Sequence, residues 1–188
     1  MPELKLYMIL LGCTPKGRHT EQHDIFFGIG TSLGDLKQNM IDFWPEAQGK
    51  IHIDAWREVT NVDSFKIEII TRDAPGKKES PQKLFFINLG GYKRNEFEEF
   101  HYKILTVADD KGKAIQKAKQ TSFYIHTGFE GGAASHVDDK YGIDVDDIYE
   151  IEDILPAHLK EKYAIVTSPQ LNLSADELFL GYVKLEKI

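Results

Sequence analysis

Residues 5–38 and 83–116 of this chain are similar when they are aligned at a separation of 78 positions. Nine of the 34 aligned pairs are identical, where chance gives about two. After about six extra residues near 128–135, the separation becomes 84. We therefore predict two similar units in tandem. The repeated pairs include Gly12/Gly90, Glu21/Glu99, His23/His101, His52/His136 and Asp54/Asp138.

Each copy shows the same order of patterns. Alternating apolar residues predict strands, and a stripe at helical spacing after the second strand predicts a helix. In the first copy we expect strands at 5–11, 22–30, 51–58 and 64–70, with a helix over 31–46 that Thr31 or Ser32 caps. In the second copy we expect strands at 83–89, 100–107, 135–139 and 147–154, with a helix at 110–123 that Asp109 or Asp110 caps.

The strand–strand–helix–strand–strand order predicts an α+β fold. It is typical of a ubiquitin-like β-grasp roll, in which one mixed sheet packs on one helix, and a ferredoxin-like variant is the alternative. We expect a first repeat at 1–72, a linker at 73–82 and a second repeat at 83–188. Two apolar segments near 162–168 and 176–185 predict a C-terminal hairpin that completes the second copy.

Charge and composition narrow the classes of function. The hydrophobic fraction of 41% is enough for a folded core, and the net charge of −7 disfavours binding to nucleic acid or to anionic membranes. No apolar run approaches the roughly 18 residues that span a bilayer. Cys13 is the only cysteine, which fits a reducing cytoplasm. The segment LKLYMILLGC (4–13) resembles a lipoprotein cleavage site, but its internal copy at 83–91 favours a strand.

Two short patterns could carry chemistry. Glu21-x-His23 and His52-x-Asp54 each place two side chains on one side of a strand. Four such donors from adjacent strands would suit zinc, iron or manganese. The competing interpretation is structural, with each carboxylate holding a nearby imidazole or loop amide. The same patterns recur at Glu99, His101, His136 and Asp138.

The first loop offers a different kind of site. Lys16 and Arg18 lie in a Gly- and Pro-containing segment that could hold a small anion. The competing interpretation is a soluble turn. The acidic stretch 144–153 could attract cations, and we interpret it as a solvated face.

Several motifs resemble an uncharacterised, mainly bacterial family, domain of unknown function 1543. The resemblance rests on Leu-Gly-Gly-Tyr (89–92), Glu-x-His-Asp (21–24), His-Ile-Asp-x-Trp (52–56) and Ile-Glu (67–68), and covers roughly residues 4–155 in two copies. It implies a bacterial, cytoplasmic protein and brings no activity. Asp24 and Trp56 have no counterpart in the second copy, which makes the first copy the better candidate for a working site.

The sequence thus predicts a non-catalytic cytoplasmic binding or interaction module. Its partner would be an unknown protein or small molecule, and neither nucleic acid nor a membrane. No cofactor is expected, with a divalent metal as the remaining option. The alternative is a metal-dependent, hydrolase-like enzyme that uses Glu21, His23, His52 and Asp54, and a self-associating structural protein is a third option.

Overall fold

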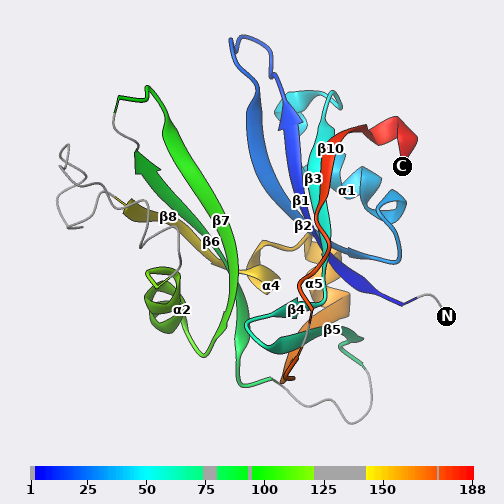
Figure 1. The fold of residues 1–188 in the computed structure, drawn as a ribbon. Helices are drawn as coiled ribbons and strands as arrows, with labels where there is room; N and C mark the ends of the chain where they lie inside the picture. The colour runs from blue at the N-terminus through cyan, green and yellow to red at the C-terminus, as the bar shows by residue number, and fades with distance from the viewer. Residues whose placement is uncertain (1–2, 74–79, 93–94, 121–142, 173) are drawn as a thin grey trace. The chain divides into compact units, whose positions relative to one another are not determined.

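A computed structural model describes residues 3–73, 80–92, 95–120, 143–172 and 174–188 (Figure 1). The chain forms two compact units. The first unit contains residues 1–79 and 154–188, and the second unit contains residues 80–153. The fold is α+β and consists mainly of strands.

The first unit is built on a four-stranded antiparallel sheet in the order β10-β3-β1-β2 (Figure 1). In β1, side chains at every second position are buried, from Tyr7 to Cys13, so this face forms the core. The other face of β1, which includes Gly12, is turned away from that core. The strands are β1 (Lys5–Cys13), β2 (Gln22–Gly30), β3 (His52–Val59) and β10 (Phe179–Lys184).

A short helical region covers the core face. It consists of η1 (Gly34–Leu36), α1 (Lys37–Phe43) and η2 (Pro45–Ala47). The prediction that Thr31 or Ser32 caps the helix is wrong. The side chain of Asp35 instead binds the backbone of these two residues. Its carboxylate accepts hydrogen bonds from the backbone amides of both residues, at 2.8 and 3.1 Å. These bonds fix 31–32 as a turn, and the helical region therefore begins only at Gly34.

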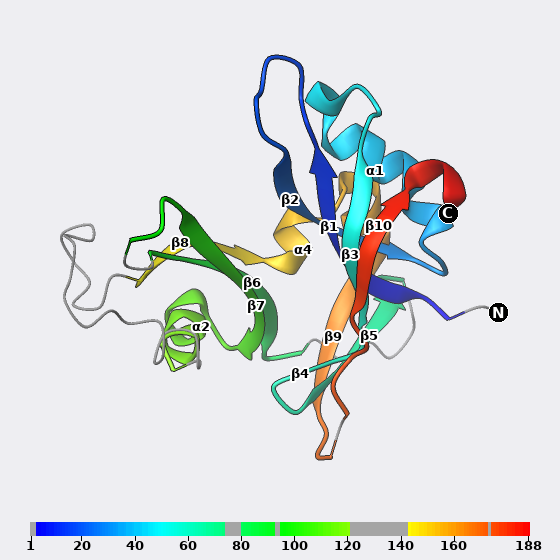
Figure 2. The same cartoon turned by 45° about the horizontal axis from the view of Figure 1, so that its top comes forward.

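A smaller antiparallel sheet, in the order β4-β5-β9, completes the first unit (Figure 2). Both C-terminal strands, expected to complete the second copy, pair instead with strands of the first: β9 with β5, and β10 with β3. Each supplies the row of amides and carbonyls that an otherwise unpaired edge requires. The elements are β4 (Asn61–Val62), β5 (Phe65–Thr71), α5 (Ala157–Lys162), β9 (Tyr163–Pro169) and η3 (Leu185–Lys187).

The second unit has the strand order β7-β6-β8 and one helix, α2. Phe85, Ile87 and Leu89 of β6 are buried against Ala114 and Ala118 of the helix. The cap predicted at Asp110 is confirmed, since its side chain accepts a hydrogen bond from the Lys113 amide. The elements are β6 (Lys83–Tyr92), β7 (Glu99–Ala108), α2 (Lys111–Ala118), β8 (Ile143–Glu150) and α4 (Ile151–Ile154).

Three expectations for the fold need correction. All the described strand pairs are antiparallel, so the mixed sheet of a β-grasp roll does not occur among them. The strand predicted at 147–154 instead spans 143–150, and a short helix follows it. The helix predicted at 110–123 ends at Ala118, and the strand predicted at 135–139 lies outside the described residues.

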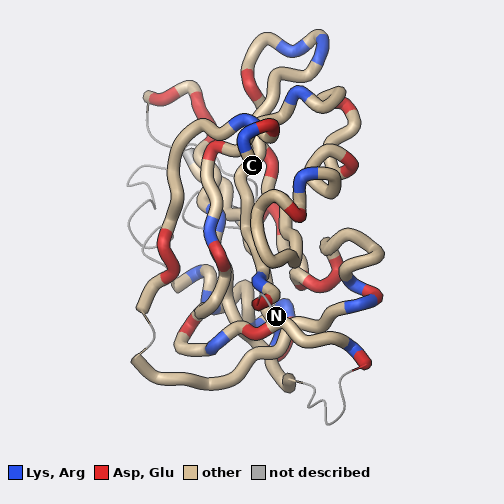
Figure 3. Tube along the Cα trace, turned by 90° about the vertical axis from the view of Figure 1, so that its right-hand side faces the viewer, with Lys and Arg blue, Asp and Glu red and all other residues tan. Residues whose placement is uncertain are grey.

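In the described part of the chain, no helix is long and apolar enough to cross a membrane. Acidic and basic residues are both scattered along the described chain, as Figure 3 shows.

Candidate functional site

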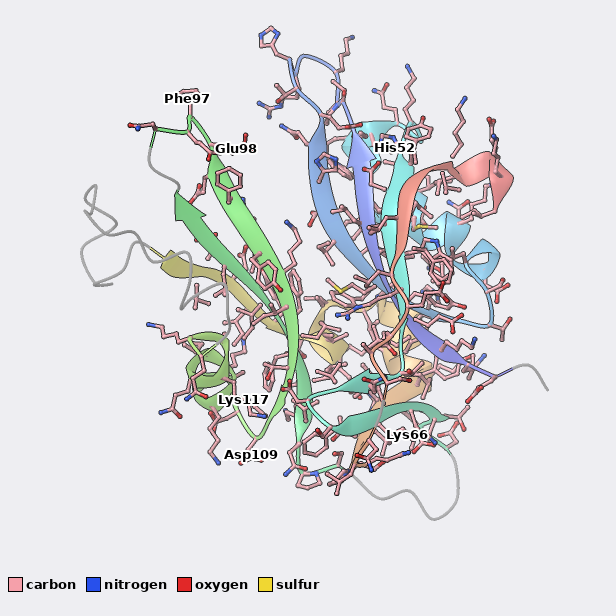
Figure 4. All side chains as sticks on the ribbon, in the orientation of Figure 1. His52, Lys66, Phe97, Glu98, Asp109 and Lys117 are labelled. Carbon is pink, nitrogen blue, oxygen red and sulfur yellow. The ribbon has the colours of Figure 1, made fainter. Side chains whose placement is uncertain are left out.

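Three strands of the first unit meet at Gly12. In the β1–β2 register Gly12 lies opposite His23, and in the β1–β3 register it lies opposite His52. Directly opposed residues of antiparallel strands point to the same face of the sheet. The two histidines therefore flank the glycine on the sheet face that is turned away from the core, where Figure 4 marks His52.

Gly12 leaves space for the side chains around it. A Cβ at this position would lie 2.6 Å from His52 Nε2 and would collide with Asp54 Oδ2. Even alanine therefore requires these groups to move. The glycine is a condition for the two side chains to meet over the middle strand.

A β-bulge brings Asp54 into this space. Leu10 pairs with Ala55 and Leu11 pairs with Ile53, so Asp54 is the extra residue of β3. A bulge changes the direction of the side chain that it carries. Without it, residues two apart on a strand are separated by about 6.5–7 Å. The bulge explains why the carboxylate of Asp54 reaches both imidazoles.

The four predicted donors form a closed ring in which carboxylates and imidazoles alternate. His52 Nε2 lies 3.0 Å from Glu21 Oε1 and 3.3 Å from Asp54 Oδ1. His23 Nε2 lies 3.6 Å from Glu21 Oε2 and 3.2 Å from Asp54 Oδ2. Glu21 precedes β2 by one residue, so the ring is held by the hairpin on one side and by β3 on the other. The structure thus brings Glu21, His23, His52 and Asp54 together.

One oxygen in this ring lacks a hydrogen bond. Asp54 Oδ2 is buried and accepts none, although His23 Nε2 is 3.2 Å away. A buried carboxylate oxygen without a partner is costly. The side chain of His52 is 10% exposed, whereas that of Glu21 is 44% exposed, so the ring opens to solvent on the Glu21 side.

The C-terminal strand covers the buried side of the ring. The ring of Tyr182 in β10 packs on the imidazole of His52, with 4.4 Å between centroids. A second irregularity in the β10–β3 register, between Leu180 and Val183, contains Tyr182 and Gly181, whose φ is +128°. Nearby, Phe179 stacks on Trp56 at 4.0 Å. Tyr182 therefore restricts the orientation of His52. The sequence did not indicate this contact.

The loop between β1 and β2 places its two basic residues differently. Pro15 O accepts a hydrogen bond from the Arg18 amide, and Gly17 has a φ of +84°, as in a type II turn. Lys16 and Arg18 are both exposed. Arg18 also lines an open hollow of about 550 Å³, and the other lining residues are Pro15, Gln22, His23, Asp24, Phe43, Trp44 and Glu46.

Cys13 belongs to the core rather than to the site. Its side chain is buried beside the ring. Burial and then the charge of Glu21 raise the pKa of its thiol. A thiol that resists ionisation is a poor nucleophile, and it is a poor metal ligand for the same reason.

The second unit contains a related cluster of three donors. Glu99 and His101 lie together at the start of β7, as predicted, and the carboxylate of Asp146 meets the imidazole. His136 and Asp138, the predicted partners, lie outside the described residues. The similar segments are Ile-His-Ile-Asp (51–54) and Ile-Asp-Val-Asp (143–146), each followed four residues later by Glu58 or Glu150. The similarity between these two segments is the sequence signal for Asp146, and it lies in the acidic stretch 144–153 that we interpret as a solvated face.

The family comparison agrees with the sequence in the first unit. Residues 18–69 match the model described as Domain of Unknown Function (DUF1543), and this range contains all four members of the ring. The second copy stays a prediction. No curated protein matches the chain.

One solved structure is similar over almost the whole chain. It is the crystal structure of protein Il1583 from Idiomarina loihiensis, with a TM-score of 0.61 and 19% identity, and the alignment covers 97% of this chain and 98% of that chain. At this identity the likeness concerns the fold alone.

Proposed function

We propose that the first unit is a binding module for one divalent transition-metal ion, held by Glu21, His23, His52 and Asp54. The observation that supports the proposal most strongly is the buried Asp54 Oδ2, which accepts no hydrogen bond and lies 3.2 Å from His23 Nε2. A cation between the donors would satisfy this oxygen and would compensate the charge of both carboxylates.

The spacing of the donors suits such an ion. Bonds of about 2.0–2.1 Å to a tetrahedral Zn²⁺ place neighbouring donors roughly 3.3 Å apart. The four nitrogen–oxygen distances of the ring lie between 3.0 and 3.6 Å, and each carboxylate turns a different oxygen toward each imidazole. Binding of one ion therefore requires the four side chains to turn one donor atom each toward it. Neutral imidazole with carboxylate favours zinc, iron, manganese or nickel over calcium and magnesium, which prefer oxygen ligands.

Protein purified without a histidine tag tests the proposal. After chelation and dialysis, calorimetry with Zn²⁺ is expected to show tight binding that His23→Ala removes. Co²⁺ should develop the visible absorption of a tetrahedral complex. At a free Zn²⁺ concentration 100 times Kd, stability should rise by about 2.7 kcal/mol.

The titration of His23→Ala can also contradict the proposal. If His23→Ala titrates like the wild type, the ring is a set of ion pairs and not a metal site. Lys16→Ala is the matched control, because it removes an exposed cation from the neighbouring loop. We expect that variant to bind the ion unchanged.

The hollow beside His23 favours a second candidate, a metal-dependent, hydrolase-like enzyme. Arg18 supplies a cation and Trp44 an aromatic surface in a hollow that contains one of the ring imidazoles. Four protein donors fill a tetrahedral ion, so catalysis requires an ion with more ligands or the release of exposed Glu21. Hydrolysis of p-nitrophenyl phosphate that requires metal and falls in Arg18→Ala, with metal binding intact, would support this candidate. Metal binding without any such hydrolysis would leave the module as proposed.

Two further parts of the proposal rest on other observations, namely the strand order of the two units and the composition of the chain. We infer that the two units arose by duplication, since the central strands, the bulges and the glycines correspond. The lone buried cysteine and the negative net charge support a cytoplasmic module whose partner is neither nucleic acid nor a membrane. Fractionation of the native host tests the location.

A further inference from the structure

The second unit contains a cluster of three donors outside the first-unit site. One ligand atom from each of Glu99, His101 and Asp146 can be chosen so that all three lie within 4.8 Å of one another. His101 Nε2 is 3.3 Å from Asp146 Oδ2, close to the 3.2 Å between His23 Nε2 and Asp54 Oδ2. The geometry of one imidazole against one carboxylate is therefore the same in both units.

The backbone that supports these donors is also the same. Gly90 lies opposite His101 in one register and opposite residue 144 in the other. Asn88 pairs with Asp147 and Leu89 with Val145, which leaves Asp146 as the extra residue of a β-bulge. A Cβ at Gly90 would collide with Asp146 Oδ2, as a Cβ at Gly12 would with Asp54 Oδ2.

A second shared contact fixes this correspondence at the other end of the strands. Lys5 Nζ lies 2.7 Å from Glu58 Oε2, and Lys83 Nζ lies 2.7 Å from Glu150 Oε2. The two strand pairs therefore correspond at the glycine and at the Lys–Glu contact, and Asp146 is the counterpart of Asp54. The strand pairing places Glu99, His101 and Asp146 beside one another, and their exposed side chains meet at this point.

We propose that Glu99, His101 and Asp146 bind a second divalent ion, more weakly than the first-unit site and with coordination positions open to water. This site goes beyond the proposed function and does not depend on it. Two carboxylates and one imidazole favour an oxygen-preferring ion such as Mn²⁺ more than the first site does. The side chain of His101 is 39% exposed, against 10% for His52, so bound water has access.

Calorimetric titration of the tag-free, metal-stripped full chain with Mn²⁺ and Zn²⁺ tests the second site. The expected result is two classes of site whose Kd values differ roughly tenfold or more, about 1.4 kcal/mol. Asp146→Asn should remove the weaker class and leave the tighter one unchanged. Enhanced water-proton relaxation by the bound Mn²⁺ should decrease in the same variant, because the open site is lost.

Three controls separate this site from the first. His23→Ala should keep the weak class, so binding that survives in His23→Ala and is lost in Asp146→Asn supports the second site even if the first is absent. His101→Ala must behave like Asp146→Asn, with an unchanged circular dichroism spectrum as evidence of folding. Weak binding that persists in both second-unit variants would overturn the proposal and leave the cluster as an ion pair.

Discussion

The two histidine clusters use one backbone arrangement with different side chains and different cover. In the first unit the residue opposite the central glycine is His52, and β10 places Tyr182 over it. In the second unit the equivalent residue is Asp144, and β8 pairs with β6 alone among the described strands. Strand order and bulges thus position the side chains of both clusters, whereas the residue opposite the glycine and the covering strand differ between them.

Filling the space over the middle strand should have the largest effect. Gly12→Ala places a methyl group against His52 and Asp54, so we expect tight Zn²⁺ binding to be lost while the weak site remains. Gly34→Ala is the matched control, because its Cβ would have neighbours no closer than 3.6 Å. Calorimetry on both variants measures the difference. Tight binding retained in Gly12→Ala would show that the ion lies elsewhere.

Exchanging the residues opposite the glycines should convert one cluster toward the other. His52→Asp replaces one imidazole of the ring with a carboxylate, the residue type at the equivalent position of the second unit. We expect the Zn²⁺ affinity of the first unit to fall tenfold or more, about 1.4 kcal/mol. Asp144→His should strengthen the weaker class of site. Equal affinities in all of these proteins would mean that residues 52 and 144 do not contact the ions.

Removing the cover should have a smaller effect. Tyr182→Ala frees the imidazole of His52, and we expect metal binding to weaken by less than about tenfold. Tyr182→Phe keeps the ring contact and should bind nearly as well as the wild type. A Phe variant as weak as the Ala variant would assign the effect to the hydroxyl group instead.

Alkaline pH should distinguish the two units with the smallest change. Burial, followed by the charge of Glu58, raises the pKa of Tyr7 to about 12. The equivalent residue of the second unit is Phe85, which does not titrate. Because the folded-state pKa is raised, the contribution of neutral Tyr7 is complete below pH 10 and is lost as pH rises from 10 toward 12. The expected decrease is roughly 1–2 kcal/mol.

Thermal melts between pH 9 and 11 test this effect. The wild type should lose stability more steeply than Tyr7→Phe as pH rises. Parallel curves for the two proteins would assign the alkaline instability to other groups.

Much of the first cluster was predictable, because it depends on local spacing and on recurrence. Glu21-x-His23 and His52-x-Asp54 were recognised as pairs from the two-residue period of strands. Their meeting was not predictable, since it requires β1 to lie between β2 and β3 with a bulge at Asp54. Neither the strand order nor a bulge has a clear signature in a single sequence.

The second cluster contains a residue, Asp146, that the alignment did not predict. His136 and Asp138 match the letters of His52 and Asp54, so the repeat was extended through them. The strand that pairs with β6 instead begins at Ile143 and has an aspartate where the first copy has His52. The register of a strand is set by which of its side chains are buried. The pairs Ile53/Val145 and Glu58/Glu150 therefore indicate that residues 143–150 correspond to β3.

The partners of the C-terminal strands were also beyond the sequence. β10 joins β3 across more than a hundred residues, and apolar alternation reveals a strand without revealing its neighbour. We predicted a hairpin on the second copy because the two segments follow that copy in the chain. The two strands pair instead with the open edges of β3 and β5.

The return of residues 154–188 to the first unit has a consequence during synthesis. The second unit, residues 80–153, is complete on the ribosome before β9 and β10 have been made. Domains fold as units while the chain emerges, so the unit that begins first should finish last. Until Tyr182 leaves the exit tunnel, His52 has no cover, and an ion captured earlier would meet an unfinished sheet. The tighter of the two proposed metal sites should therefore mature only after β10 has left the exit tunnel.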